Sequence, residues 1–240
     1  LQGDWSSDVC SSDLVNISSG TNVNVSNAEI RFVYENDITS NGMVFNNITV
    51  SCPGWFRAVD KMTITGLAKF NSFNVVHGLI ETSGDVLMAD VSQSTSSGTL
   101  KFIGSNNQSL SAGGNFGVFP NIMIQKSGGL LTVTDTIKLS LGLTWVSGAV
   151  DASNSTFVFY NGSQTIDAEG LNFGNVEINM QGNLVLARPL KVDGNLNIKA
   201  INAISGERIE VRGNVENTNT FFWGDGVETY LVGSNNQTLT

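Results

Sequence analysis

Short apolar pairs alternate with polar, glycine-rich punctuation along this chain. Apolar residues recur at every second position, most clearly in Met62/Ile64, Val86/Met88, Leu131/Val133, Ile137/Leu139, Val176/Ile178, Leu184/Leu186, Leu190/Val192, Leu196/Ile198 and Ile209/Val211. Because successive side chains of a strand point to opposite faces, this spacing predicts short β-strands with one buried face. Clusters such as SGG at 127–129 and DGN at 193–195 predict tight turns between them. No long stretch has helical spacing, so we expect almost no helix.

One motif, Phe-x-Asn-(Ile/Val)-x-(Val/Ile), occurs three times, at 45–50, 119–124 and 173–178. A polar turn precedes each copy: IGSNNQSL at 103–110, FYNGSQTI at 159–166 and, more weakly, VYENDIT at 33–39. A further turn of this kind, VGSNNQTL, occupies 232–239. Such internal similarity indicates that one supersecondary unit is repeated along the chain. We expect Phe45, Phe119 and Phe173 in the core, and Asn47, Asn121 and Asn175 at turns where their amides contact an adjacent turn.

The spacing of the copies favours a β-solenoid over tandem globular modules. The motif phenylalanines are 74 and 54 residues apart, and segments 130–143 and 183–196 align at a constant offset of 53. If one turn takes about 18 residues, the intervals of 74 and 54 residues are close to four and three turns. Differences in length between copies would then come as whole turns. We therefore predict an all-β parallel β-solenoid of about ten to twelve turns. Tandem small β-sandwich modules are the alternative fold.

Residues 4–14, DWSSDVCSSDL, resemble the translation of a sequencing-adapter primer site. We set residues 1–14 aside as an artefactual, disordered segment. Residues 15–240 are then expected to be a single continuous solenoid region, truncated at both ends. Without Asp4, Asp8 and Asp13 the formal net charge falls from −9 to −6.

Composition excludes several classes of function. The mild acidity and the lack of a basic cluster argue against nucleic acid as a partner. No apolar run approaches the roughly 20 residues that span a bilayer, so we expect no membrane insertion within this segment. Once Cys10 is discounted, Cys52 cannot form an internal disulfide. With His77 as the single histidine, we expect Cys52 to be a turn residue and predict no metal site or cofactor.

Two groups of residues are candidates for binding or catalysis. Asp135, Asp151 and Asp167 lie sixteen residues apart and could align along a solenoid, as the paired carboxylates of a glycan-cleaving enzyme require. Asp135 and Asp151 also fit ordinary turns, so we assign no catalytic residue. Three adjacent aromatics, Phe221, Phe222 and Trp223, cannot all face one core, and a ligand role for this patch is weighed against packing over the solenoid. Trp55 and Trp145 are further candidates for sugar stacking.

The chain resembles the β-strand-repeat segments of large secreted or surface-anchored bacterial proteins, including adhesin-like passengers. The resemblance rests on G-(S/T)-N-x-Q-(T/S)-(L/I), then F-x-N-(I/V)-x-(I/V), then apolar pairs ending at G-x-L, and it covers most of residues 30–240. It implies an extracellular or cell-surface location and a scaffold, stalk or adhesive role.

Three functions follow from these observations. The first is a non-enzymatic structural or adhesive segment of a large extracellular protein, with surface glycans or other cell-surface proteins as partners. The second is a carbohydrate-binding surface. The third is a polysaccharide lyase or hydrolase built on the solenoid. We also expect uncovered strand edges at both ends and end-to-end self-association of this chain.

Overall fold

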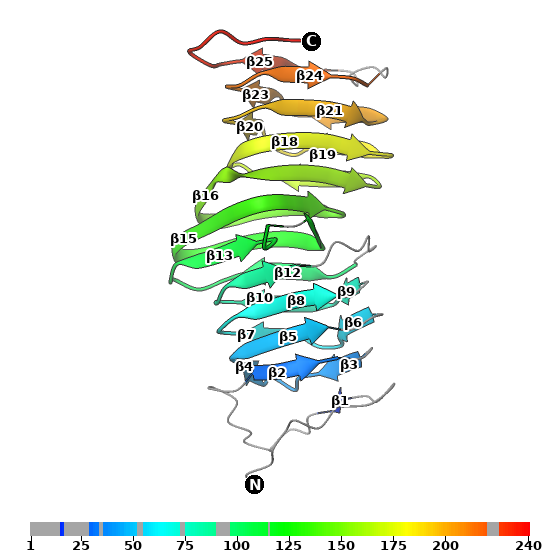
Figure 1. Ribbon diagram of the computed structural model, residues 1–240, viewed down its shortest axis with the longest axis vertical. Coiled ribbons are helices and arrows are strands. Elements are labelled where there is room, and N and C mark those ends of the chain that lie inside the picture. Colours follow the sequence, from blue (N-terminus) through cyan, green and yellow to red (C-terminus); the bar gives the residue numbers. More distant parts are fainter. Residues whose placement is uncertain are drawn as a thin grey trace.

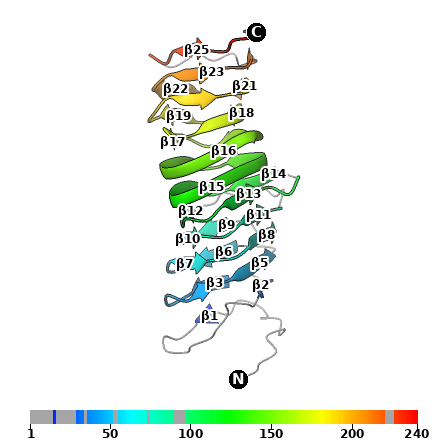
Figure 2. The same ribbon diagram turned by 90° about the vertical axis from the view of Figure 1, so that its left-hand side faces the viewer.

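The apolar pairs line the inside of a parallel β-solenoid in the computed structural model, which describes residues 15–16, 29–33, 36–51, 55–72, 75–89, 97–114, 116–219 and 226–240. Figures 1 and 2 show its turns stacked along the long axis, with β1 near one end and β25 at the other. There are about nine turns, and the described residues include no helix. The predicted fold class is confirmed. The predicted artefact at 4–14 lies outside the described residues.

Each turn has three sides, and each side stacks on the same side of the next turn. The first side holds β2 (Glu29–Phe32), β5 (Asn47–Ser51), β8 (Ala68–Ser72), β11 (Val86–Met88), β13 (Gln108–Ser111), β20 (Leu190–Val192), β23 (Ile209–Val211) and β25 (Thr229–Leu231). The second holds β1 (Val15–Asn16), β3 (Asn36–Thr39), β6 (Trp55–Ala58), β9 (Val75–His77), β14 (Phe116–Phe119), β21 (Leu196–Ala200) and β24 (Val215–Asn217). The third holds β4 (Val44–Phe45), β7 (Met62–Ile64), β10 (Leu79–Thr82), β12 (Thr99–Phe102), β17 (Gln164–Asp167), β19 (Asn183–Leu186) and β22 (Ala203–Gly206).

Three long strands bend around corners without losing their ladder. β15 (Asn121–Leu139) and β16 (Gly142–Asn161) each run along all three sides, and β18 (Asn172–Met180) covers two. The pairing of β15 with β16 contains register shifts, as expected where a continuous strand turns a corner. All of the pairings are parallel, so each strand obtains its backbone partners from the turns above and below.

The inward positions form one apolar column. All nine predicted pairs are buried, each member at 2% exposure or less, and Phe45, Phe119 and Phe173 are at most 1% exposed. Phe157 packs edge-on against Phe173, with ring centroids 4.8 Å apart. Since every turn covers its neighbour, the column is closed over the whole described stack except at its last turn.

Turn length varies, which corrects the uniform 18-residue turn predicted from the intervals. Met62 stacks beneath Ile80, 18 residues later, whereas Val86 stacks beneath Leu110, 24 residues later. Most steps lie near 20; Ile80 beneath Leu100 is one. The longer turns account for there being about nine turns, close to but fewer than the predicted ten to twelve.

The three motif copies mark three different corners, so they are not separated by whole turns. Phe45 ends β4 on the third side, Phe119 ends β14 on the second, and Phe173 lies on the first. At roughly 20 residues per turn, the intervals of 74 and 54 correspond to about three and two-thirds and two and two-thirds turns. The repeated unit is therefore one corner with its flanking strands, and its three copies occupy three different corners of the solenoid.

Candidate functional site

Three glutamines from the repeated polar turns clamp three corners; Gln108 and Gln164 are buried, and Gln237 is partly exposed. Gln108 Nε2 donates to Thr82 O at 3.1 Å and Gly84 O at 2.8 Å, both in the preceding turn. Gln237 Nε2 donates to Val211 O and Gly213 O at 2.9 and 2.6 Å. Gln164 Nε2 donates to Leu139 O at 2.7 Å and Tyr160 O at 2.5 Å. We call Gln108, Gln164 and Gln237 the corner glutamines; each ties a polar turn to backbone carbonyls at its corner, of which Thr82 O and Val211 O also accept a backbone N–H.

The carbonyl oxygens of the corner glutamines have different environments. Gln237 Oε1 accepts from the backbone N–H of Gly233 at 2.9 Å, and Gln108 Oε1 accepts from Lys126 Nζ. Gln164 Oε1 is buried with no hydrogen-bond partner in the described structure. The amide nitrogens of all three corner glutamines are therefore used for folding contacts, and the side chains of Gln108 and Gln164 are shielded from solvent.

Lys126 is a buried cation inside one of these corners. Its side chain is 2% exposed, and Nζ also donates to Asn106 O at 2.8 Å. Burial lowers the pKa of Lys126, because removing an ammonium from water disfavours its charged form. The Cβ that a side chain at Gly148 would carry would lie 2.7 Å from Lys126 Cβ, so the next turn closes directly over the lysine. Lys126 is thus enclosed by the stack and out of reach of a macromolecular ligand.

Asparagines connect consecutive turns at the corners, as the motif predicted, but mainly as acceptors. Asn47 Oδ1 accepts from Leu67 N at 2.7 Å, and Asn175 Oδ1 accepts from Asn195 N at 2.9 Å. Asn195 repeats the contact one turn later with Asn214 N at 2.8 Å. Asn121 instead donates through Nδ2 to Thr99 Oγ1 at 3.4 Å. These amides satisfy N–H groups that the bend removes from the ladder.

The aspartate series does not converge on a site. Asp135 lies at a corner, paired with Ser155; Asp151 lies on the first side, paired with Thr132; Asp167 lies on the third side, paired with Thr144. Sixteen residues is less than one turn, so the three carboxylates progress around the axis instead of aligning along it. The structure therefore supplies no pair of facing carboxylates from this series.

Asp135 serves the fold in a specific way. Its carboxylate accepts from Ser111 Oγ at 2.6 Å and from Ala112 N at 3.1 Å, in the turn below. The Ser111 hydroxyl, together with the backbone N–H groups of residues 112–114, holds the pKa of Asp135 below its usual value against the opposing effect of burial. Its φ of 67° is left-handed, a conformation that aspartate tolerates better than most residues.

The aromatic candidates give no described row of sugar-stacking rings. Trp145 is partly buried: Nε1 donates to Gly148 O at 2.9 Å, and a Cβ built on Gly170 would lie 2.2 Å from the indole ring. Lys138 Nζ stands 5.6 Å from the ring centroid of Tyr160. Phe221, Phe222, Trp223 and Cys52 lie outside the described residues, as do the side chains of Trp55 and His77.

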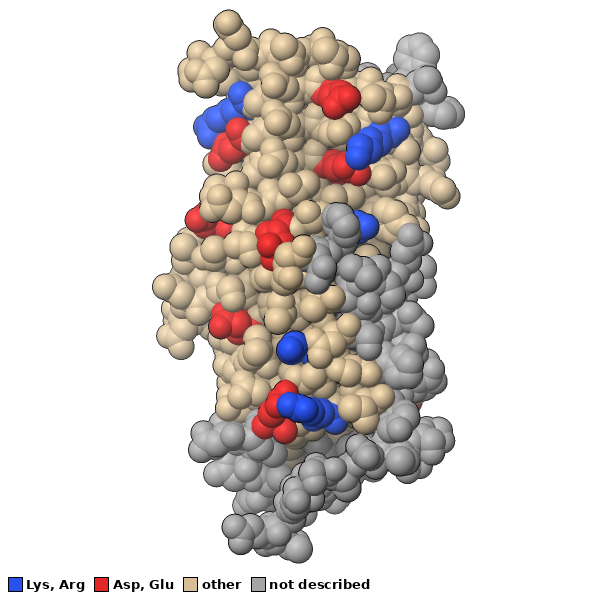
Figure 3. Space-filling view, viewed as in Figure 1, with Lys and Arg blue, Asp and Glu red and all other residues tan. Residues whose placement is uncertain are grey.

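Charged groups on the sides are dispersed in mixed pairs. Glu81 bridges Lys61 at 3.1 Å and Lys101 at 2.9 Å, and Glu177 pairs with Lys199 at 2.8 Å. Figure 3 shows small red and blue groups scattered over one face, without a large patch of either sign. No group of three His, Cys, Asp or Glu side chains suited to a metal ion occurs among the described residues.

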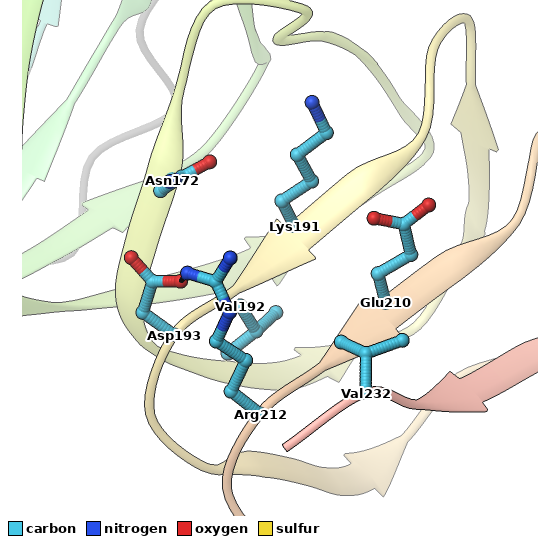
Figure 4. A pocket seen from close by; sticks show the side chains of 7 residues that line it. All are labelled: Asn172, Lys191, Val192, Asp193, Glu210, Arg212 and Val232. Carbon is cyan, nitrogen blue, oxygen red and sulfur yellow. Dashed lines mark hydrogen bonds and ion pairs between the residues drawn. The ribbon is translucent and has the colours of Figure 1, made fainter. Parts of the chain in front are cut away.

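A hollow with charged lining residues lies on the first side near the C-terminal end. It is lined by Asn172, Lys191, Val192, Asp193, Glu210, Arg212 and Val232 and holds about 30 Å³, roughly the volume of one water molecule. Figure 4 shows the Arg212 guanidinium directed at the Asp193 carboxylate, with which it forms an ion pair, while Lys191 and Glu210 point away from that pair. A hollow of this size cannot enclose a sugar ring.

The sequence contains a signal for the inward position of the corner glutamines, of which Gln108 and Gln164 are buried. Each one stands two residues before an apolar residue of the same strand face, as in Gln108 and Leu110 or Gln164 and Ile166. Period-two alternation places both members of such a pair on the inward side. Lys126 carries the same positional signal, since it continues the inward alternation of Ile122 and Ile124, but a lysine is rarely buried without polar partners, and its partners lie one turn below.

Comparison with known proteins identifies no relative: no family model, no curated protein and no solved structure matches the chain. Among the described residues, no helix is both long and apolar enough to cross a membrane.

Proposed function

We propose that this chain is a non-enzymatic structural or adhesive repeat segment of a large extracellular or cell-surface protein. The proposal rests on the hydrogen-bond partners of the polar side chains at the corners. The buried polar side chains at the corners, Gln108, Gln164 and Lys126, all bond to the stack itself, and Asp135 does the same from a less buried position. Such a molecule gains length and rigidity by adding turns, which suits a shaft or spacer.

The sides of the solenoid support an adhesive function in addition to a spacer function. They carry dispersed ion pairs and polar ladder positions, and a surface of this kind binds partners through many weak contacts spread over its length. We propose surface glycans or other cell-surface proteins as those partners. The sequence resemblance to bacterial adhesin-like passengers favours the same function and location.

A carbohydrate-binding surface and a polysaccharide-cleaving enzyme are the alternatives. The first would gain support from exposed aromatic side chains aligned on one side. The Trp145 indole, however, donates to Gly148 O and packs closely against Gly170. The second needs convergent carboxylates, whereas Asp135, Asp151 and Asp167 lie at different places around the axis. Neither alternative therefore has a described constellation to carry it.

Binding and cleavage assays with the whole chain separate these functions. Beads coated with the protein should adhere to glycan-coated or cell surfaces in a density-dependent manner, while soluble polysaccharides should release no new reducing ends or unsaturated products. The matched variant Asp151→Asn should behave identically, since Asp151 bonds only to Ser153 beside it among the described residues. Catalytic product formation that this variant abolishes would overturn the proposal.

A further inference from the structure

The polar turn at 161–163 contains an Asn-Gly step whose reactive groups have no hydrogen-bond partner. Asn161 ends β16 with a φ of 77°, in the left-handed region, and its side chain bonds to no residue that the structure describes. The Gly162 N–H donates to no acceptor in the described structure, and Gly162 is exposed. A Cβ built on Gly162 would meet nothing within 4 Å. The side-chain amide and the backbone nitrogen that follows it are therefore both accessible.

The other Asn-Gly step of the chain, Asn41-Gly42, has a different environment. Gly42 N donates to Ser40 Oγ at 3.3 Å, and Asn41 N donates to Asp60 Oδ2 at 2.8 Å. Met43 N closes the turn by donating to Ser40 O at 3.0 Å. The nitrogen of Gly42 is thus engaged in a hydrogen bond, and the next turn of the solenoid holds the step in place.

An asparagine followed by glycine can close a cyclic imide, because glycine has no side chain to block the approach of its nitrogen. Gly162 N would give up its proton and form a bond to Asn161 Cγ. The bond from Cγ to Nδ2 breaks, and Nδ2 leaves with that proton as ammonia. Water then opens the imide at one of its two carbonyls. Opening at the main-chain carbonyl gives isoaspartate, whereas opening at the side-chain carbonyl gives aspartate.

We propose that Asn161 is a site of spontaneous deamidation, and that the isoaspartate formed there loosens the corner that Gln164 clamps. Isoaspartate adds one methylene to the main chain directly before the turn. That turn is fixed by two hydrogen bonds: Gln164 Nε2 donates to Tyr160 O at 2.5 Å, and Asn183 N donates to Ser163 Oγ at 3.0 Å. A longer link displaces the groups that make these bonds, whereas aspartate leaves the main chain unchanged. The inference is independent of the proposed function.

Peptide mapping by mass spectrometry tests the first part of the proposal on the whole chain, incubated at neutral pH. Asn161 should lose its amide several-fold faster than Asn41, and both aspartate and isoaspartate should accumulate at position 161. Gly162→Ala should slow this loss several-fold, because its methyl group hinders the attacking nitrogen. The fold accepts that variant, since the φ of Gly162 is not positive and the space around it is open. Equal rates at Asn161 and Asn41, or an alanine variant that reacts as fast as the unmodified chain, would overturn the proposal.

Thermal unfolding tests the second part. The midpoint of the aged chain should fall in step with its isoaspartate content, whereas the midpoint of Gly162→Ala, aged in the same way, should stay nearly constant. Asn161→Asp isolates the new charge, because it carries the aspartate product on a normal main chain, and it should melt like the fresh unmodified chain. If the midpoint does not fall as isoaspartate accumulates, or if Asn161→Asp melts as low as the aged chain, the longer link does not loosen the corner.

Discussion

At the scale of single residues, polar side chains at the corners are used to bond one turn to the next. Gln164 shows the logic most simply, because it is 3% exposed and faces two backbone carbonyls. An amide is suited to this place because its nitrogen has two protons to donate and no charge to desolvate. The recurring glutamine of the polar turns is thus explained by backbone carbonyls at the corners, which can accept a side-chain N–H in addition to a backbone one.

Replacing the Gln164 amide by an isosteric carboxylate should lower the stability of the fold strongly. In Gln164→Glu, an oxygen would face Leu139 O and Tyr160 O where Nε2 now donates, and we expect a loss of about 3 kcal/mol or more in unfolding free energy at pH 7. Burial and the two carbonyls would raise the folded-state pKa of the new carboxyl. The penalty should therefore grow as pH rises above about 4.3, the unfolded-state pKa, and shrink below it.

Gln181→Glu is the control for the charge change, because Gln181 is exposed and the substitution there should cost within about 0.5 kcal/mol. Denaturant unfolding at pH 7 and pH 4 measures both variants. Equal costs at the two positions, or a Gln164→Glu penalty that does not change with pH, would show that the glutamine is not a buried clamp.

At the scale of elements, the strands were predictable and their stacking was only partly so. The pairs from Met62/Ile64 to Ile209/Val211 identified inward positions because period-two alternation depends only on local geometry. Turn length depends on how many residues each corner consumes, and corners such as 103–107 differ from corners such as 65–67. Intervals of whole turns require the motif copies to mark one corner, whereas Phe45, Phe119 and Phe173 mark three.

The candidate site was less predictable than the fold. The spacing of Asp135, Asp151 and Asp167 could be interpreted only with the true turn length, since sixteen residues align along the axis only if one turn takes sixteen. Lys126 continues the inward alternation of Ile122 and Ile124, but a buried ammonium needs polar partners, and these are Asn106 and Gln108 one turn below. The local pattern gives the inward position, and only the long-range stacking shows what it contacts.

Removing one whole turn should leave a folded solenoid. Val176 stacks beneath Leu196, so deletion of residues 176–195 places Leu196 on Phe157 and β22 on β17, in the original register. The new junction, Gly174-Asn175-Leu196, repeats the native Gly194-Asn195-Leu196. Because solenoid stability is approximately a sum over neighbouring turns, we expect cooperative unfolding with a modestly lowered midpoint.

A half-turn deletion provides the contrast. Loss of 176–185 removes the strand that covers β16 on the second side and leaves the following strands on the wrong sides, so we expect loss of cooperative melting. Circular dichroism and thermal unfolding compare the two variants. If both fold equally well, or if the whole-turn deletion fails while the half-turn deletion folds, the stacking register is not what organises the chain.

At the scale of the whole molecule, carboxylates connect turns along much of the stack. Asp60 accepts from Ser40 N at 2.7 Å and Asn41 N at 2.8 Å, one turn below. Burial alone would raise the pKa of Asp60, but these hydrogen bonds outweigh it and the pKa is lowered. Burial alone would also raise the pKa of Glu81, but the hydrogen bonds from Lys101 and Lys61 outweigh it and the pKa is lowered. Asp135 belongs to the same set.

Acid should therefore loosen the solenoid as a whole. A carboxyl whose folded-state pKa lies below its unfolded value contributes stability that is complete above the unfolded value, about 4, and is lost as pH falls through the folded one. Between those limits the unfolded chain binds more protons, so unfolding free energy must decrease with falling pH. We expect the melting midpoint to be nearly constant from pH 7 to 5 and to fall steeply from pH 4 to 2. Scanning calorimetry measures this.

Asp135→Asn isolates one contribution to that slope. Asparagine keeps the size of the side chain and tolerates the left-handed backbone at this corner, so the variant should be less stable at pH 7, by about 1 kcal/mol, with the difference vanishing near pH 2. Asp151→Asn is the comparison, since the carboxylate of Asp151 bonds to its neighbour Ser153 and to no other turn of the described structure. Its effect at pH 7 should be the smaller of the two. A midpoint that stays flat into acid, or two variants with the same pH dependence, would mean that the carboxylates between turns do not stabilise the stack.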